Sequence, residues 1–172
     1  MDQTQRWPAL AKNNDDLLNE LMDSLKNRVM GDPYSSDGSY ATELSSLPRG
    51  LRAMAATHWL DVSLSLDSLT WHFGNFGEPG LVTQTEEALL ELHLVDLARL
   101  FREAADLMRP FVDQMSPEHP PDELLEKAGL MERGREIDHR AWDLSKSGTG
   151  DSAIYEAWVA YVREHPERVF GS

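Results

Sequence analysis

The sequence predicts an all-α fold, a single-domain irregular bundle of about six to eight helices. Apolar residues recur at spacings of three and four along most of the chain, which is the pattern of one buried helix face. Clusters of glycine and proline divide these stretches into helix-length segments. With 172 residues, of which 41% are hydrophobic, the chain is long enough to build one sizeable core.

The N-terminal part is predicted to contain an arm, a helix and a loop. We expect residues 1–11 to form a flexible arm and residues 12–172 to form the single helical domain. Asn13 is suited to cap the first helix, because its side chain can accept a hydrogen bond from a free backbone N–H of the first turn. Residues 31–33 end that helix, and the Ser-, Asp- and Gly-rich stretch from 34 to 46 predicts a surface loop.

A second helix is expected to begin at Leu47 and Pro48 and to continue to Val62, because proline is tolerated in a first helical turn. Residues 64–73 either extend this helix or form another. Their partly alternating pattern leaves a short strand open, and we favour helix. Three glycines and a proline between Gly74 and Gly80 then predict a tight loop anchored by an aromatic residue.

The second half of the chain is predicted to be helical between short breaks. Thr83 to Glu86 has the form of a capping box, which indicates a helix start, and an apolar stripe continues to Val112 with a break near His93. Residues 116–121 form a proline-rich linker. Further helices are expected over residues 124–144 and, after a glycine turn at 148–150, from a cap at Asp151 or Ser152 to His165.

Composition and charge exclude several classes of protein. Thirty acidic against 16 basic residues give a formal net charge of -14, which repels nucleic-acid phosphates and anionic lipids. The absence of cysteine excludes disulfides, thiolate nucleophiles and sulfur-ligated zinc. No stretch approaches the ~18–20 apolar residues of a membrane helix, and Met1 to Leu10 lacks a secretory-signal pattern. We therefore expect a cytoplasmic protein that binds neither nucleic acid nor membranes directly.

Motifs that would indicate enzymatic chemistry are weak. Residues 148–153 fit a loose G-x-G-x-x-A pattern, but no hydrophobic strand precedes them, so a loop is the better interpretation. Three pairs at helical spacing offer metal ligands without the further ligands that a site needs: His58 with Asp61, His93 with Asp96, and Glu136 with His139. Helical spacing assigns the following aromatic residues to the core in preference to a ligand pocket: Trp59, Trp71, Phe73, Phe76, Phe101 and Trp158. We predict no catalytic residue, no metal and no cofactor.

The distribution of charge along the chain is more informative. Between Arg52 and Arg99 there is neither Lys nor Arg, whereas the acidic centre, residues 53–98, contains these acids: Asp61, Asp67, Glu78, Glu86, Glu87, Glu91 and Asp96. Glu87 and Glu91 lie one helical turn apart, an arrangement of like charges that costs about 0.2–0.5 kcal/mol. One interpretation is a solubilising face. The other is a surface of one sign that presents carboxylates where a nucleic acid presents phosphates.

One segment carries a family resemblance. Leu66 to Asn75 (LDSLTWHFGN), followed by Ala88-Leu89, Leu92-His93, Ala98, Phe101 and Ala104, resembles the shared domain of the bacterial DNA-mimic protein family. That domain typically shows an Asn-Gly-Gly-Phe run, a Gln-Phe-Phe-x-Asn run and, after a glycine-containing loop, a helix of Ala-Leu-x-x-Ile-Gly type. Leu69 stands for the first Phe, Trp71 to Phe73 for the Gln-Phe-Phe run, and Asn75 matches, whereas Leu66 to Ser68 replaces Asn-Gly-Gly and His93 replaces the last glycine.

The resemblance implies an all-helical domain, often dimeric, of a family whose known members bind a DNA-binding protein through an acidic surface. Together with the acidic centre it leads to our main hypothesis, a bacterial interaction protein that is not an enzyme and whose seven acids contact a basic protein such as a DNA-binding regulator. A homodimer is a further expectation. Two alternatives stay open: an enzyme or small-ligand binder that uses residues 74–80 with His58, His72 or His93, and an immunity- or antitoxin-like inhibitor.

Overall fold

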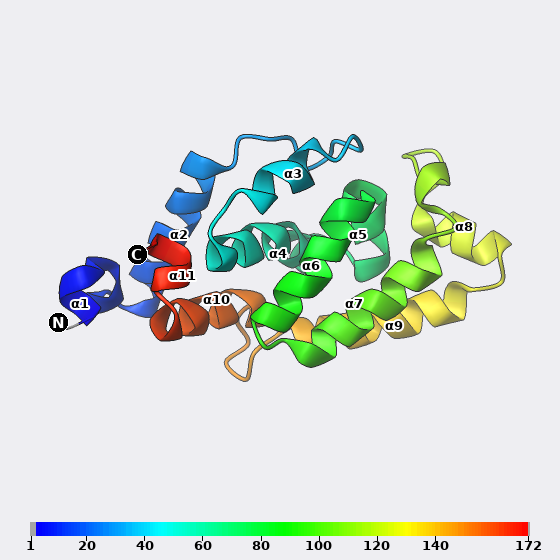
Figure 1. Cartoon of the computed structure of the whole chain (residues 1–172). Coiled ribbons are helices and arrows are strands. Elements are labelled where there is room, and N and C mark those ends of the chain that lie inside the picture. The colour runs from blue at the N-terminus through cyan, green and yellow to red at the C-terminus, as the bar shows by residue number, and fades with distance from the viewer. Residues whose placement is uncertain (1–2, 172) are drawn as a thin grey trace.

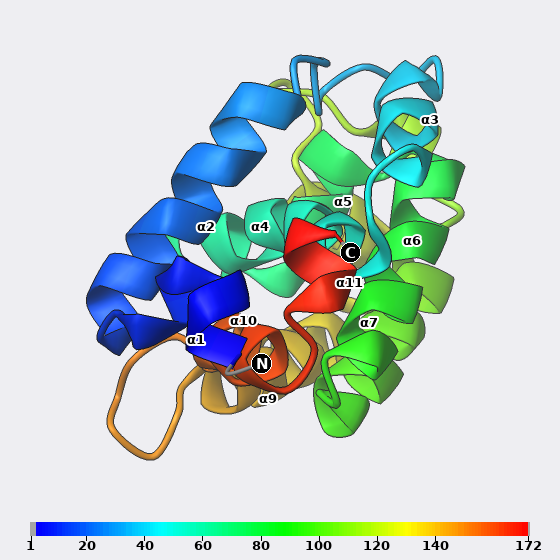
Figure 2. The ribbon, with the colours of Figure 1, turned by 60° about the vertical axis from the view of Figure 1, so that its left-hand side comes forward.

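Helix α4, Arg49–Leu66, runs through the middle of the molecule, and most of the other helices pack around it (Figures 1 and 2). The structure is a computed structural model and describes residues 3–171. Helix α4 is buried on nearly all sides, which is the mark of a core helix. Its buried residues are Gly50, Leu51, Ala53, Met54, Ala55, Ala56, Thr57, Leu60, Asp61, Ser63 and Leu64.

The predicted all-α class is confirmed: over residues 3–171 the chain forms helices α1 to α11 and the 3-10 helices η1 and η2, and no β-strand. Six to eight helices was an undercount, because several helices are too short to show an apolar period. Besides α4, the helices are α1 (Gln3–Arg6), η1 (Pro8–Ala11), α2 (Asn14–Arg28), α3 (Ser39–Ser45), α5 (Leu69–Phe76), α6 (Pro79–Glu91), α7 (Val95–Met108), η2 (Val112–Gln114), α8 (Pro121–Lys127), α9 (Met131–Ser145), α10 (Ala153–Glu164) and α11 (Glu167–Phe170).

The predicted N-terminal arm contains α1 and η1 in its described part. The indole N–H of Trp7 donates to the carbonyl of Gly171 at 3.4 Å, and the guanidinium of Arg163 donates to the carbonyl of Leu10 at 3.1 Å. These bonds place the first and last helices on the same side of the molecule (Figures 1 and 2). The mobility of the arm stays a prediction, and its first two residues lie outside the described part.

Helix α2, the first helix that the sequence predicts, begins at the expected position. The Asn13 side chain accepts a hydrogen bond from the backbone N–H of Asp16 at 2.9 Å and so caps α2. Two other predicted boundaries are also confirmed. His93, with a left-handed φ of 61°, separates α6 from α7, and the Ser152 hydroxyl caps α10 by accepting from the N–H of Tyr155 at 3.1 Å.

The loop predicted over residues 34–46 is wrong in its second half, which forms α3. Tyr40 and Leu44 are buried in the core, so tertiary packing outweighs the weak helix propensity of this Ser-rich stretch. Residues 64–73 are helical at both ends, as favoured, because α4 ends at Leu66 and α5 begins at Leu69.

The loop predicted over residues 74–80 shrinks to Gly77 and Glu78, because α5 continues to Phe76 and α6 begins at Pro79. Proline fits the first helical position, where no backbone N–H is needed, and the Glu78 carboxylate accepts from the two backbone N–H groups that follow. Gly77 permits a close approach of the chain, because a Cβ there would lie 2.4 Å from the carbonyl oxygen of Phe73.

The helix start predicted from the Thr83 to Glu86 capping box is wrong, because both residues lie inside α6. Residues 124–144 form two helices where one was predicted. Gly129, with φ of 70°, ends the first of them, and Gly134 lets α9 pack closely against Leu125 of α8. Among the described helices none has the length and apolar character required to cross a bilayer.

Helix α6 packs against α4 and buries Leu81, Ala88 and Leu89 in the core. Leu89 is fully buried in the core, whereas its neighbour Leu90 is 45% exposed. We expect Leu89→Ala to lower the free energy of unfolding by about 2–5 kcal/mol, because the vacated volume cannot be refilled. Leu90→Ala removes the same atoms and should change it by less than about 0.5 kcal/mol. Urea unfolding followed by circular dichroism measures both, and equal losses would contradict this packing.

Candidate functional site

Asp61, one of the seven acids of the acidic centre, is buried between α4 and α10. It is 5% exposed and accepts a hydrogen bond from the Ser152 hydroxyl. Burial raises the pKa of Asp61, and hydrogen bonds from Ser152 and Tyr155 partly oppose that rise. Asp61 therefore interacts inside the protein and offers no charge to a partner's surface.

Three more of these acids already have partners. The Glu78 carboxylate caps α6 by accepting from the backbone N–H of Gly80 and of Leu81 at 2.9 and 2.7 Å. Glu86 pairs with Arg102 of α7, and Asp96 lies 3.4 Å from Arg99, one turn along the same helix. Both side chains of the pair between Asp96 and Arg99 are exposed to solvent, so this ion pair contributes little to stability.

Glu91 is the most heavily bonded acid of the seven. Its carboxylate pairs with Arg49 at the start of α4 and lies 3.1 Å from Arg168 of α11, and it accepts a hydrogen bond from the Tyr161 hydroxyl. Its side chain is only 12% exposed. Burial acts against the charged form, but the tyrosine hydroxyl and the two guanidinium groups outweigh it, so the pKa of Glu91 lies below its usual value.

Asp67 and Glu87 are exposed, and within residues 3–171 neither carboxylate has an ion pair or hydrogen bond. Asp67 lies near Asp122 of α8, whereas Glu87 faces α4. The seven acids therefore do not form one continuous exposed surface, because Asp61 is buried and Glu86 and Glu91 are paired with arginines. The expectation that no cation lies among them is wrong, because folding brings in arginines from outside the interval: Arg49, Arg99, Arg102 and Arg168.

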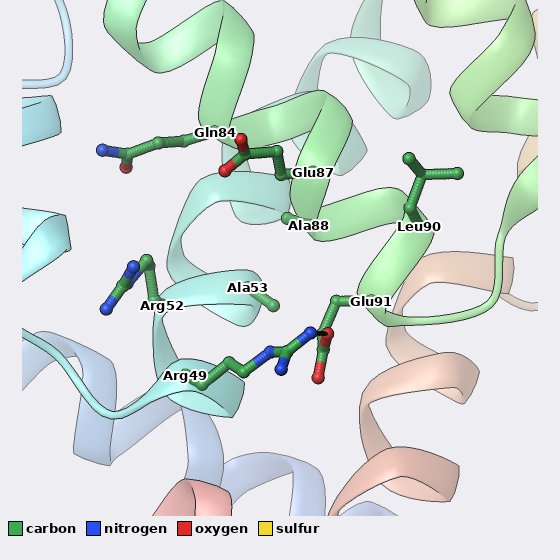
Figure 3. Close-up of a pocket in the computed structure, with 8 residues that line it drawn as sticks. All are labelled: Arg49, Arg52, Ala53, Gln84, Glu87, Ala88, Leu90 and Glu91. Carbon is green, nitrogen blue, oxygen red and sulfur yellow. Dashed lines mark ion pairs between the residues drawn. The ribbon is translucent and has the colours of Figure 1, made fainter.

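The acids Glu87 and Glu91 meet at a groove between α4 and α6, which we call the α4–α6 groove (Figure 3). It has a volume of about 530 Å³. Figure 3 shows arginines projecting from α4 on one side and acids from α6 on the other. The groove is lined by Arg49, Arg52, Ala53, Gln84, Glu87, Ala88, Leu90 and Glu91.

The polar side chains of this groove differ in whether they already have an ion pair or a hydrogen bond within the protein. Arg49 and Glu91 neutralise each other, and one Nη atom of Arg52 donates to the carbonyl of Leu47 at 3.3 Å. The side-chain amide nitrogen of Gln84 donates a hydrogen bond to the carbonyl of Ala41 at 2.7 Å. Neither Glu87 nor Arg52 has an ion pair among the described residues, and of these two charged groups Glu87 is the exposed one.

The histidines considered for an enzyme do not come together. His72 is buried among phenylalanine rings, with Nδ1 2.9 Å from the Ser63 hydroxyl, and burial lowers its pKa to about 3. His93 is exposed at the turn between α6 and α7, and His58 lies half-buried in α4. No group of three potential metal ligands exists within residues 3–171.

Several residues of the groove and its surroundings were not identified from the sequence. Arg49 and Arg52 directly precede the cation-free interval, which is a signal that they could face its acids. Gln84, Ser152 and Tyr155 carry no such signal, because only packing places them beside Arg52 or Asp61.

Comparisons of the chain with protein-family models, with curated proteins and with solved structures found no match. Its function is therefore inferred from the geometry and chemistry of its own residues.

The ion pairs and the hydrogen bond of Glu91 should stabilise the fold in a pH-dependent way. We expect Glu91→Gln to lower the free energy of unfolding by about 1–3 kcal/mol at neutral pH, because it removes a charge that two arginines and a tyrosine share. The folded-state pKa is lowered, so this contribution is complete above the pKa of the unfolded chain and is lost as pH falls through the folded value. The gap between wild type and variant should therefore narrow in acid.

Urea unfolding at a series of pH values measures that gap. Glu87→Gln is the matched control, one helical turn away, and should change stability by less than about 0.5 kcal/mol. A gap that stays constant from neutral pH to well below the usual glutamate pKa would show that the charge of Glu91 is not what stabilises the fold.

Proposed function

We propose that this protein is an interaction domain that binds a basic protein, and that the α4–α6 groove is the contact site. One observation carries the proposal: Glu87 is left without a cation at a groove where its neighbour Glu91 has two arginines. A lysine or arginine of a partner could form an ion pair with the Glu87 carboxylate, as the two arginines do with Glu91. Arginine can form that pair with two parallel hydrogen bonds.

The overall charge supports a basic partner. With a formal net charge of -14, the protein attracts cationic surfaces from a distance and repels anionic ones. Exposed acids outside the acidic centre add to that field, among them Asp15 and Asp16 of α2 and Glu126 of α8. Attraction of this kind mainly accelerates association, whereas the groove would supply the specific contact.

A DNA-binding regulator is the partner class that the sequence resemblance suggests. The arginines beside Glu86, Glu91 and Asp96 reduce the number of acids that could replace phosphates, so we propose a local contact at Glu87 in place of an extended row. Such a contact would still overlap a partner's DNA-binding surface, and DNA would then compete with this protein.

A pair of variants tests the groove. Glu87→Gln removes the unpaired carboxylate, and Glu126→Gln removes another exposed glutamate, on α8 and outside the lining of the groove (Figure 1). With the tagged full chain as bait, we expect a partner whose recovery falls with the first variant and not with the second. For the purified partner, Glu87→Gln should weaken binding by about three- to fivefold, as the loss of one rim ion pair does.

Binding should also weaken as salt rises, and a DNA duplex should displace the partner. Equal recovery with both variants would remove the groove from the proposal. Affinity that does not change with salt would remove the electrostatic basis altogether, and a partner that holds DNA and this protein together would exclude mimicry.

A further inference from the structure

A second concave site lies on the other side of α4, where α2 and the segment before α3 cover it; we call it the α2–α4 cavity. Its volume is about 340 Å³, within the usual range for small-molecule sites. Apolar groups form most of its wall: Met22, Leu25, Val29, Pro33, Ala55 and the ring of Trp59. Asp23 and Lys26, 3.8 Å apart at its edge, cancel each other's charge.

His58 lines this cavity, and its hydrogen bonds leave one ring nitrogen as a free acceptor. Asp61 receives the hydroxyl of Ser152 and also interacts with the hydroxyl of Tyr155, and a carboxylate can only accept. The Tyr155 proton is therefore directed at Asp61. The Tyr155 oxygen, 3.1 Å from Nδ1 of His58, then accepts the proton on that nitrogen.

The remaining ring nitrogen of His58, Nε2, consequently carries a lone pair. Burial lowers the pKa of His58, which keeps the ring neutral at pH 7 and the lone pair free. Within residues 3–171 no group donates to Nε2, although His58 lines the cavity.

Tyr40, which also lines the cavity, has a free hydrogen-bond donor where His58 has a free acceptor. The indole N–H of Trp59 donates to the Tyr40 oxygen at 3.1 Å, and an indole nitrogen cannot accept. The hydroxyl proton of Tyr40 has no acceptor among the described residues, and this side chain, 4% exposed, lines the cavity. A buried hydroxyl without an acceptor costs free energy that a ligand carbonyl would recover.

We propose that the α2–α4 cavity binds a small, neutral, flat molecule that donates one hydrogen bond to His58 Nε2 and accepts one from Tyr40. Flatness follows from the aromatic wall, in which Trp59 stacks on Phe76 with ring centroids 5.5 Å apart and so stays fixed in orientation. Neutrality follows from the charges that line the cavity, because Asp23 and Lys26 pair with each other and leave no unpaired charge for a charged ligand. This inference is independent of the proposed protein partner.

The probe for the test is 7-hydroxycoumarin, which carries a hydroxyl donor and a lactone carbonyl on one flat ring system. Titration of the full chain, followed by probe fluorescence at a pH that keeps the hydroxyl protonated, should give one saturable site with a Kd below about 1 mM. The analogue 7-methoxycoumarin lacks the donor and should bind about tenfold more weakly.

Two variants locate the site. Tyr40→Phe should weaken binding about tenfold, whereas Tyr161→Phe, the same change beside the α4–α6 groove, should leave it unaltered. Met22→Trp fills the cavity and should abolish binding, with thermal unfolding to check that the variant folds. No saturable binding by the wild type, equal binding of the two coumarins, or unaltered binding by folded Met22→Trp would each overturn the proposal.

Discussion

The structure depends on the burial of helix α4 on nearly every side. A helix in that position has no solvent to satisfy its polar groups, so each of them needs a partner within the protein. The Thr57 hydroxyl donates to the carbonyl of Ala53 at 2.8 Å and accepts from the indole N–H of Trp158 at 2.9 Å. Asp61 finds its partners in α10 in the same way. These bonds fix the position of α10 against α4, together with the apolar core around them.

The central position of α4 also fixes the walls of the two proposed binding sites. Its first turn emerges beside α6 and carries Arg49 and Arg52 into the α4–α6 groove, and its middle turns place His58 and Trp59 in the wall of the α2–α4 cavity. The two sites therefore share one rigid support but differ in chemistry. The groove is charged and open enough for a protein side chain, whereas the cavity is mainly apolar with one donor and one acceptor.

The fold distributes the excess of acid unevenly. Arginines at 49, 102 and 168 neutralise Glu86 and Glu91 across helix boundaries, and Asp61 is removed from the surface. The net charge is unchanged by these pairings, but the number of acids free to act on a partner is smaller than their spacing along the chain indicates. Under the proposed function, long-range attraction would come from the whole surface and local recognition from Glu87.

Local signals in the sequence were sufficient to predict the all-α class and several helix boundaries. These signals act within one or two helical turns: the helix periodicity, the Asn13 cap, the break at His93 and the Ser152 cap. They failed where burial competes with propensity, as in α3, and where Glu78 and Pro79 start α6 before the capping box at Thr83.

The site depended on tertiary structure, since charge along a chain and charge in space are different distributions. The sequence by itself determined the fold class, the surplus of acid and the absence of cations between Arg52 and Arg99. Only folding decided which carboxylates meet an arginine, because Arg49, Arg102 and Arg168 reach them from helices that the local pattern does not place.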